Sequence, residues 1–251
     1  MVRKLVVLGM LVSLVWTGRA AGASTAGAAV TIISPTARAW GLGQSYVAVA
    51  DDATATYWNP GGLGFLEGTD VSLTHSKLVP MLADDVYFES VNLSHRVPDI
   101  GTFAMSLAYL SLGKWPRTDD AGNLIGEESS YEWALGGYYA FPLGKSNAFG
   151  IGLKAIYSAL VAGEATGWSF AADAGILGHP LDWLSYGVAL QNLGPNISYV
   201  NSDQSEPLYR TFRVGAALVP ITTDFYSLLL SLESSKLLVE IKDIELSLIH
   251  I

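Results

Sequence analysis

The chain of 251 residues contains no cysteine. This absence excludes a disulfide framework, a thiol nucleophile and a thiolate metal site. The sequence also lacks a Gly-x-Ser-x-Gly elbow, a phosphate loop and a dinucleotide fingerprint. Its four histidines are scattered without the paired spacing of a metal site: His75, His95, His179 and His250. We therefore expect no enzyme activity, no cofactor and no bound metal.

Charged residues are also scarce. They make up 15% of the chain, against about 25% in an ordinary soluble domain, while half of the residues are hydrophobic. Beyond the amino terminus no run of 18 apolar residues occurs, so membrane helices are not expected. A chain that crosses a bilayer without such helices must close a sheet on itself, because every backbone polar group has to be paired internally. A soluble β-sandwich or propeller is the alternative, since strand periodicity does not identify the solvent.

Residues 1–23 predict a secretory signal peptide. Arg3 and Lys4 precede the apolar run Leu5 to Trp16, and Ala21-Gly22-Ala23 supplies a small-residue cleavage site. An uncleaved membrane anchor is the alternative, but the run is short for one. Without this segment the net charge is about −12, which argues against nucleic acid as a partner.

Long strands are predicted from alternation with a period of two. Between Tyr131 and Phe141, a set of mostly large apolar and aromatic residues alternates with a set of mostly small or charged ones, Gly137 and Tyr138 being the exceptions. The alternation continues for eleven residues, from Tyr131 to Phe141, which matches the roughly 9 to 11 residues of a tilted membrane strand. Strands of this kind are predicted at 69–79, 85–97, 101–112, 130–141, 148–161, 167–177, 184–193, 208–219 and 226–234. The fold class predicted is therefore all-β, with a transmembrane up-and-down antiparallel β-barrel over residues 67–234.

The connections differ between the two ends of the predicted barrel. Short proline-containing turns are predicted after every second strand, at Pro98, Pro142, Pro180 and Pro220. The long polar loops 113–129 and 194–207 are predicted at the other end. This asymmetry is typical of outer-membrane barrels, whose short turns are periplasmic. Together with the signal peptide it predicts the cell outer membrane of a Gram-negative, diderm bacterium, with outer-membrane lipid as surroundings.

Polar residues occur once per strand on the predicted inward face. An unpaired charge inside a narrow barrel is costly, so we expect a lumen network of paired charges. This network either lines a substrate or ion path or braces the strands and the amino-terminal segment, and we favour bracing. Its members are Glu132, Lys154, Asp173, Gln191 and Arg213. Several glycines share this face, which would let another backbone approach, so a plug is expected rather than a wide pore.

The expected plug is the amino-terminal segment, residues 24–66. Ser45 to Val49 predicts a strand, and Ala53 to Trp58 a short helix with Asp51 or Asp52 as its cap. Asn59-Pro60-Gly61-Gly62 then ends the helix. One strand, one helix and one turn are predicted.

The run Gly43 to Leu63, above all Tyr46 to Ala55 followed by Tyr57 to Pro60, resembles the amino-terminal signature of the PorV/PorQ family. These proteins are relatives of the FadL-type outer-membrane transporters. The resemblance implies a fourteen-stranded barrel with the amino-terminal segment inside it as a plug. The motif residues it assigns to the plug are Tyr46, Asp51, Asp52, Tyr57, Trp58, Asn59 and Pro60.

The same resemblance implies export or transport across the outer membrane. Members of the PorV type serve type IX secretion, with secreted cargo or secretion-machinery proteins as partners. FadL-like members instead form channels for the uptake of hydrophobic small molecules, and this is the alternative function.

The carboxyl end departs from the family pattern. No glycine follows Gly215, aromatic residues stop at Tyr226, and the tail 235–251 lacks strand alternation. About nine strands are predicted where the resemblance implies fourteen. The expectation is a truncated or frameshifted chain, with a smaller barrel or a helical tail as the alternatives.

Overall fold

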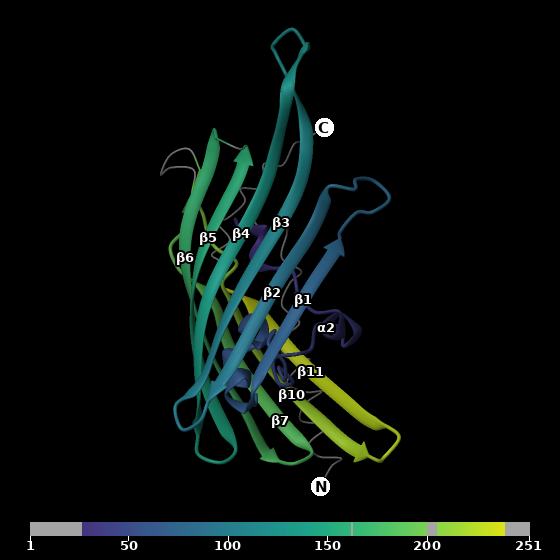
Figure 1. Cartoon of the computed structure of the whole chain (residues 1–251), viewed down its shortest axis with the longest axis vertical. Helices are drawn as coiled ribbons and strands as arrows, with labels where there is room; N and C mark the ends of the chain where they lie inside the picture. The colour runs from purple at the N-terminus through teal and green to yellow at the C-terminus, as the bar shows by residue number, and fades with distance from the viewer. Residues whose placement is uncertain (1–26, 162, 200–204, 239–251) are drawn as a thin grey trace, which may run out of the picture.

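The computed structural model describes residues 27–161, 163–199 and 205–238. The predicted signal peptide and most of the predicted tail lie outside these ranges. One antiparallel sheet of nine strands in chain order dominates the structure (Figure 1). Its strands are β1 (Thr69–Lys77), β2 (Val86–Val97), β3 (Gly101–Thr118), β4 (Leu124–Leu143), β5 (Asn147–Val161), β6 (Ala165–Leu181), β7 (Leu184–Leu193), β10 (Thr211–Thr222) and β11 (Ser227–Leu237).

This up-and-down sheet confirms the predicted all-β fold class, and each of the nine strands overlaps a predicted one. Within the described ranges β1 and β11 are the two edges, and they do not pair with each other, so these residues form an open, curved sheet. None of the helices in the described ranges has the length and hydrophobicity that crossing a bilayer requires.

The two predicted long loops contain regular structure. In place of the predicted loop 113–129, β3 and β4 continue as a hairpin that projects beyond the other strands (Figure 1). Arg117 of β3 pairs across this hairpin with Glu128 at 2.9 Å, and Asp119 accepts backbone N–H groups in its turn. The predicted loop 194–207 contains the short pair β8 (Ile197–Ser198) and β9 (Ser205–Glu206).

Three of the four predicted proline turns were placed too early. Pro98 lies in the turn between β2 and β3, whereas Pro142, Pro180 and Pro220 still belong to β4, β6 and β10. The strand register shifts around Pro180 and Pro220. A bulge accommodates proline because it removes the need for a ladder N–H donor there. The short turns nevertheless share one end of the sheet, at the bottom of Figure 1.

The amino-terminal segment is folded as short helices and turns. It contains η1 (Ala29–Thr31), α2 (Ala37–Gly41), α3 (Ala55–Trp58) and η2 (Pro60–Phe65). The predicted strand at 45–49 is wrong, because the N–H groups of Val49 and Ala50 both donate to the Tyr46 carbonyl at 3.0 Å and close a turn. The helix α3 begins later than predicted, at Ala55, with Thr54 as its N-cap residue, and the predicted cap Asp52 accepts a hydrogen bond from the Thr54 N–H at 2.8 Å just before it.

We call residues 27–66 the plug, because the sheet curves around them. The Ala53 N–H donates to Asp70 of β1 at 2.7 Å, and the Tyr46 N–H donates to Glu233 of β11 at 2.9 Å. In a flat nine-stranded sheet these edge strands would lie about 38 Å apart. The seven residue steps from Tyr46 to Ala53 span at most about 25 Å even when fully extended. The plug can therefore reach both edges only because the sheet is strongly curved.

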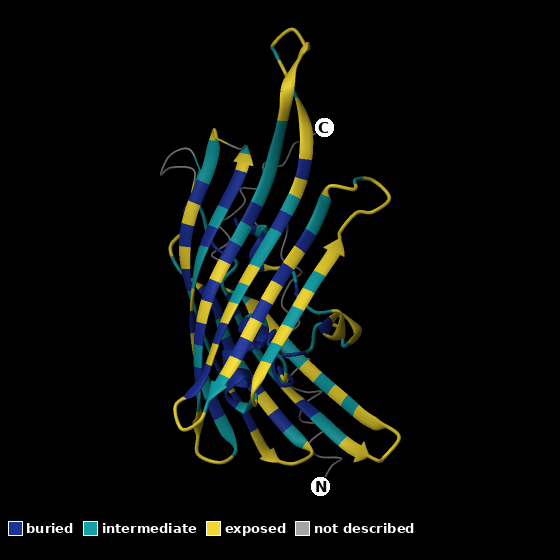
Figure 2. Ribbon diagram, viewed as in Figure 1, coloured by how far each residue is buried: buried dark blue, intermediate teal, exposed yellow. Residues whose placement is uncertain are grey.

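Burial alternates along the strands, with the plug covering one face (Figure 2). Trp58, Tyr46 and Leu63 of the plug are fully buried in the core between plug and sheet. The opposite, outer face keeps large apolar side chains exposed, for example Leu73, Met105 and Leu153. The buried face of the sheet is thus the one turned toward the plug.

Two rows of aromatic side chains cross the outer face. The row nearer the long hairpin contains Tyr87, Tyr109, Tyr131 and Tyr157, with neighbouring ring centroids 6.0 to 6.1 Å apart. The row nearer the short turns contains Phe103, Tyr139, Phe141 and Phe149. On β4, Tyr131 and Phe141 lie ten residue steps apart, which is about 33 Å along the strand and about 25 Å along the normal of a bilayer at the usual tilt. On β3 the rows are closer, because Tyr109 and Phe103 lie six steps apart, about 20 Å along the strand.

Candidate functional site: the contact between the plug and the sheet

The backbone of the plug turn at 46–50 is held by side chains of the sheet. Glu233 of β11 accepts from the N–H groups of Tyr46 and Val47, both at 2.9 Å. Ser185 of β7 donates to the Ala48 carbonyl at 2.6 Å. Backbone groups satisfied by side chains need no neighbouring strand, which explains why this β-branched and aromatic stretch does not form the predicted strand.

Asn59 connects the plug turn, the start of η2 and the sheet. Its amide nitrogen donates to the Val47 carbonyl at 2.8 Å and to the Ile176 carbonyl of β6 at 3.0 Å. Its amide oxygen accepts from the Gly61 N–H at 3.0 Å. The Asn59 side chain is fully buried, so losing these bonds would leave the bonded backbone groups buried without hydrogen-bond partners.

Glycines of the sheet allow the plug backbone to approach closely. A Cβ atom built on Gly150 would lie 2.1 Å from the Pro60 carbonyl oxygen, and one on Gly187 would lie 2.0 Å from the Val47 carbonyl oxygen. A Cβ on Gly175 would lie 2.1 Å from the Asn59 amide oxygen. These inward glycines are therefore the positions where a side chain would push the plug away.

The acidic pair of the motif interacts with groups inside the plug. Arg38 forms an ion pair with Asp51, from its two terminal nitrogens at 2.5 and 3.0 Å, and this bond raises the pKa of Arg38. The Tyr46 hydroxyl lies 2.8 Å from Asp51 and 3.1 Å from Asp52. Burial and these negative charges raise the pKa of Tyr46 well above its ordinary value. Asp52 also accepts from the Thr54 N–H at 2.8 Å, just before α3.

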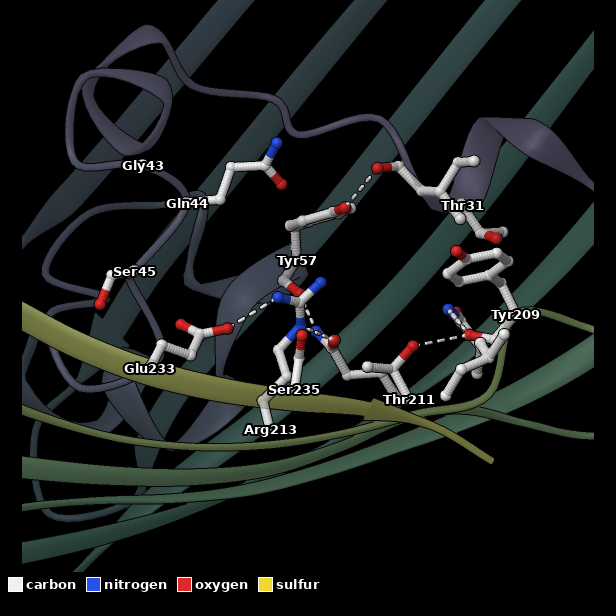
Figure 3. Close-up of a pocket in the computed structure, with 14 residues that line it drawn as sticks. Thr31, Gly43, Gln44, Ser45, Tyr57, Tyr209, Thr211, Arg213, Glu233 and Ser235 are labelled. Carbon is white, nitrogen blue, oxygen red and sulfur yellow. Dashed lines mark hydrogen bonds and ion pairs between the residues drawn. The ribbon is translucent and has the colours of Figure 1, made fainter. Parts of the chain in front are cut away.

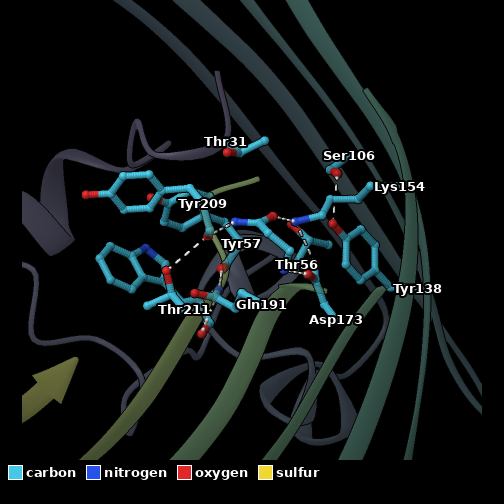
Figure 4. Close-up of polar contacts among 12 residues, drawn as sticks. Thr31, Thr56, Tyr57, Ser106, Tyr138, Lys154, Asp173, Gln191, Tyr209 and Thr211 are labelled. Atoms are coloured by element: carbon cyan, nitrogen blue, oxygen red, sulfur yellow. Dashed lines mark hydrogen bonds and ion pairs between the residues drawn. The ribbon is translucent and has the colours of Figure 1, made fainter. Parts of the chain in front are cut away.

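Lys154 and Asp173, two of the predicted inward residues, form a buried ion pair. The Lys154 amino group lies 2.9 Å from Asp173, and the two side chains are only 12% and 1% exposed. Asp173 also accepts from the Asn192 N–H at 2.7 Å, and Lys154 donates to the Asn192 side chain (Figure 4). This group joins β5, β6 and β7.

Gln191 and Arg213 belong to a second group, together with Glu233. The Arg213 guanidinium donates to Gln191 and to Glu233, both at 2.7 Å (Figure 3). Gln191 donates to the carbonyl groups of Tyr57 and Trp58 in the plug. The Arg213 guanidinium lies 4.9 Å from the Trp58 ring centroid, within the range of a cation–π contact. This group therefore binds the plug from β7, β10 and β11.

Glu132 stands apart from both groups. Its carboxylate accepts from the Val30 N–H of η1 at 2.7 Å and from the Ser158 hydroxyl at 2.8 Å. The five predicted residues thus form three separate groups, two of which, those of Glu132 and Gln191, contact the plug directly.

Sequence reasoning missed Glu233 and Asn192. Glu233 lies near the end of the last predicted strand, next to a tail that looked atypical, although strand alternation places it on the inward face opposite Gly215. Asn192 follows the inward-facing Gln191 directly, and its backbone has a φ of 58°, so it leaves the alternation. No simple sequence pattern identifies such a position.

A polar cavity of about 580 Å³ lies between the plug and β7, β10 and β11 (Figure 3). Gln44, Ser45 and Tyr57 line it from the plug, and Thr211 and Arg213 line it from the sheet. Among the described residues no cluster of three or more acidic or histidine side chains could hold a metal ion. The interface as a whole is suited to holding a segment in place by hydrogen bonds.

Comparison with known proteins gives one family. Residues 18–243 match the family model described as type IX secretion system protein PorV. No curated protein matches the chain.

Proposed function

Because the chain belongs to the family of the type IX secretion system protein PorV, we propose that it serves export across the outer membrane as a plugged barrel-type protein. In this role it handles secreted cargo or binds other proteins of the secretion machinery, and its lumen does not conduct.

The proposed membrane location rests on the outer face of the sheet. On β4 the two aromatic rows end at Tyr131 and Phe141, which are separated by about 25 Å along the normal, close to the height of the apolar band of outer-membrane barrels. Side chains between the rows, such as Met105, Leu107 and Leu135, are apolar and 44 to 57% exposed. In water this surface would be costly, whereas lipid would cover it.

The proposal that the plug blocks the lumen is supported by one observation, the attachment of the plug to the sheet. Buried side chains of β7 and β11 bond the plug backbone, the plug side chain Asn59 donates to a backbone carbonyl of β6, and three sheet glycines touch the plug without a gap. A plug held at so many points acts as a fixed wall rather than a loose lid.

Planar-bilayer conductance of the full chain, combined with affinity purification from cells that secrete by this route, tests the proposal. The expected result is no steady current, together with co-purifying exported or secretion-machinery proteins. A steady open conductance without such partners would overturn the proposal and favour a FadL-like channel for hydrophobic small molecules.

A further inference from the structure

A groove of about 860 Å³ lies on the outer face of the sheet, on the side away from the plug. The groove runs across the strands from β2 to β7. Each of these six strands contributes one outward residue, and each of these residues is the cross-strand partner of the next. They are Leu93, Met105, Gly137, Leu153, Ala172 and Leu193.

Large and small side chains alternate along the groove. Gly137 lies between Met105 and Leu153, and Ala172 lies between Leu153 and Leu193. Leu153 is 72% exposed, so it forms a ridge between two slots, one above Gly137 and one above Ala172. Nothing lies within 4 Å of a Cβ built on Gly137, which shows that its slot is open.

The position of the groove restricts what can occupy it. On β4, Gly137 lies between Tyr131 of one aromatic row and Tyr139 of the other, so in a membrane the slots lie at the depth of the hydrocarbon. Toward the short turns the groove extends to the next paired row, which consists of Phe103, Tyr139, Ile151 and Ala174 and ends on β2 at the exposed His95. The occupant must therefore be apolar in the slots and polar at the end near these turns.

We propose that the groove binds one phospholipid of the leaflet on the short-turn side, with its two acyl chains on either side of Leu153 and its headgroup near His95. Two slots fit the two chains of a phospholipid, and the volume lies in the range of specific ligand sites. The inference goes beyond the proposed function and depends on it only for placement in a membrane.

The test uses the full chain folded into vesicles of equal parts phosphatidylethanolamine and phosphatidylglycerol. After mild detergent extraction, native mass spectrometry counts the phospholipids retained per chain. Wild type should retain one. Gly137→Leu fills the first slot and should lower retention about tenfold, because it displaces a few methylene groups of the acyl chain. Ala172→Leu fills the second slot and should have a similar effect, which keeps the test decisive if one variant does not fold.

Ala155→Leu is the matched control. Ala155 is also a small outward residue between large neighbours, Leu135 and Phe170, but it lies outside the groove. Its variant should retain lipid like wild type. Equal retention by wild type, Gly137→Leu and Ala172→Leu would overturn the inference.

Other outcomes identify other occupants. Preferential retention of lipopolysaccharide from vesicles that also contain it would overturn the assignment to a phospholipid. Loss of a co-purifying membrane protein in Gly137→Leu, with lipid retention unchanged, would show that a protein fills the groove. A chain that does not float with the vesicles at all would overturn the inference and the membrane location together.

Discussion

Replacing Gly150 by alanine should detach part of the plug from the sheet. The new Cβ atom would lie 2.1 Å from the oxygen and 2.3 Å from the carbon of the Pro60 carbonyl. Ordinary contacts between such atoms are longer by about 1 Å or more. Because the obstructing atoms belong to the backbone, they cannot rotate away, and either η2 or β5 must move. Overpacking of this kind costs about 1–3 kcal/mol of the free energy of unfolding.

Gly137→Ala provides the control for this prediction. Gly137 belongs to the same sheet but faces outward, with open space around its Cβ position. Its substitution should change the free energy of unfolding by less than about 0.5 kcal/mol. Urea unfolding of both variants in detergent micelles, followed by tryptophan emission, would measure the difference. If Gly150→Ala is no less stable than Gly137→Ala, the plug does not rest on β5 and the account of the interface is refuted.

Three further predictions concern charged and titrating groups. Lys154→Met leaves the buried Asp173 carboxylate without its cation and should lower the free energy of unfolding in urea by about 3–5 kcal/mol. Bilayer conductance should stay unchanged. A loss of stability below about 1 kcal/mol would contradict the buried ion pair. Burial raises the pKa of Tyr57 to about 12, above its ordinary value of about 10. The neutral Tyr57 side chain therefore contributes fully to the free energy of unfolding below about pH 10, and this contribution is lost as the pH rises from about 10 to 12. Tyr57→Phe should therefore lose less stability than wild type across that window in an alkaline titration, and identical curves would count against a raised pKa of Tyr57. Arg38→Ala should cost less than about 1 kcal/mol in thermal unfolding, because the side chains of Arg38 and Asp51 are about half exposed; a larger loss would mean that this pair also anchors the plug.

The strands and their faces were predictable from the sequence. In Tyr131 to Phe141, alternation with a period of two specifies both the strand and the side that each residue faces, because every second side chain points the same way. The same rule placed Glu132, Lys154 and Asp173 on the plug side of the sheet. The inward glycines also pointed to a closely approaching backbone, and at Gly150 and Gly187 the structure identifies it as that of the plug. At Gly136 and Gly152 the space is instead filled by the inward side chain of Tyr138.

Contacts between distant segments were not predictable in the same way. Which inward side chain meets which depends on the stagger of the strands and on bulges, so the partnership of Arg213 with Glu233 is not visible in either strand alone. The segment Ser45 to Val49 has the residue types of a strand, yet side chains of the sheet satisfy its backbone and it turns instead. Tertiary contacts outweigh local β preference there.

The most direct test of the central claim, that the curved sheet packs around the plug, uses the absence of cysteine. Ala48→Cys places the single thiol of the chain where the plug turn packs on β7, at a position 3% exposed, and Ala37→Cys places it at an exposed position of the same segment. A membrane-impermeant maleimide added to the folded chain in vesicles should label position 37 at the rate of a free thiol. Position 48 should react at least about a hundredfold more slowly, since labelling requires local opening, and the difference should vanish in denaturant. Equal labelling of both positions in the folded chain would contradict the account.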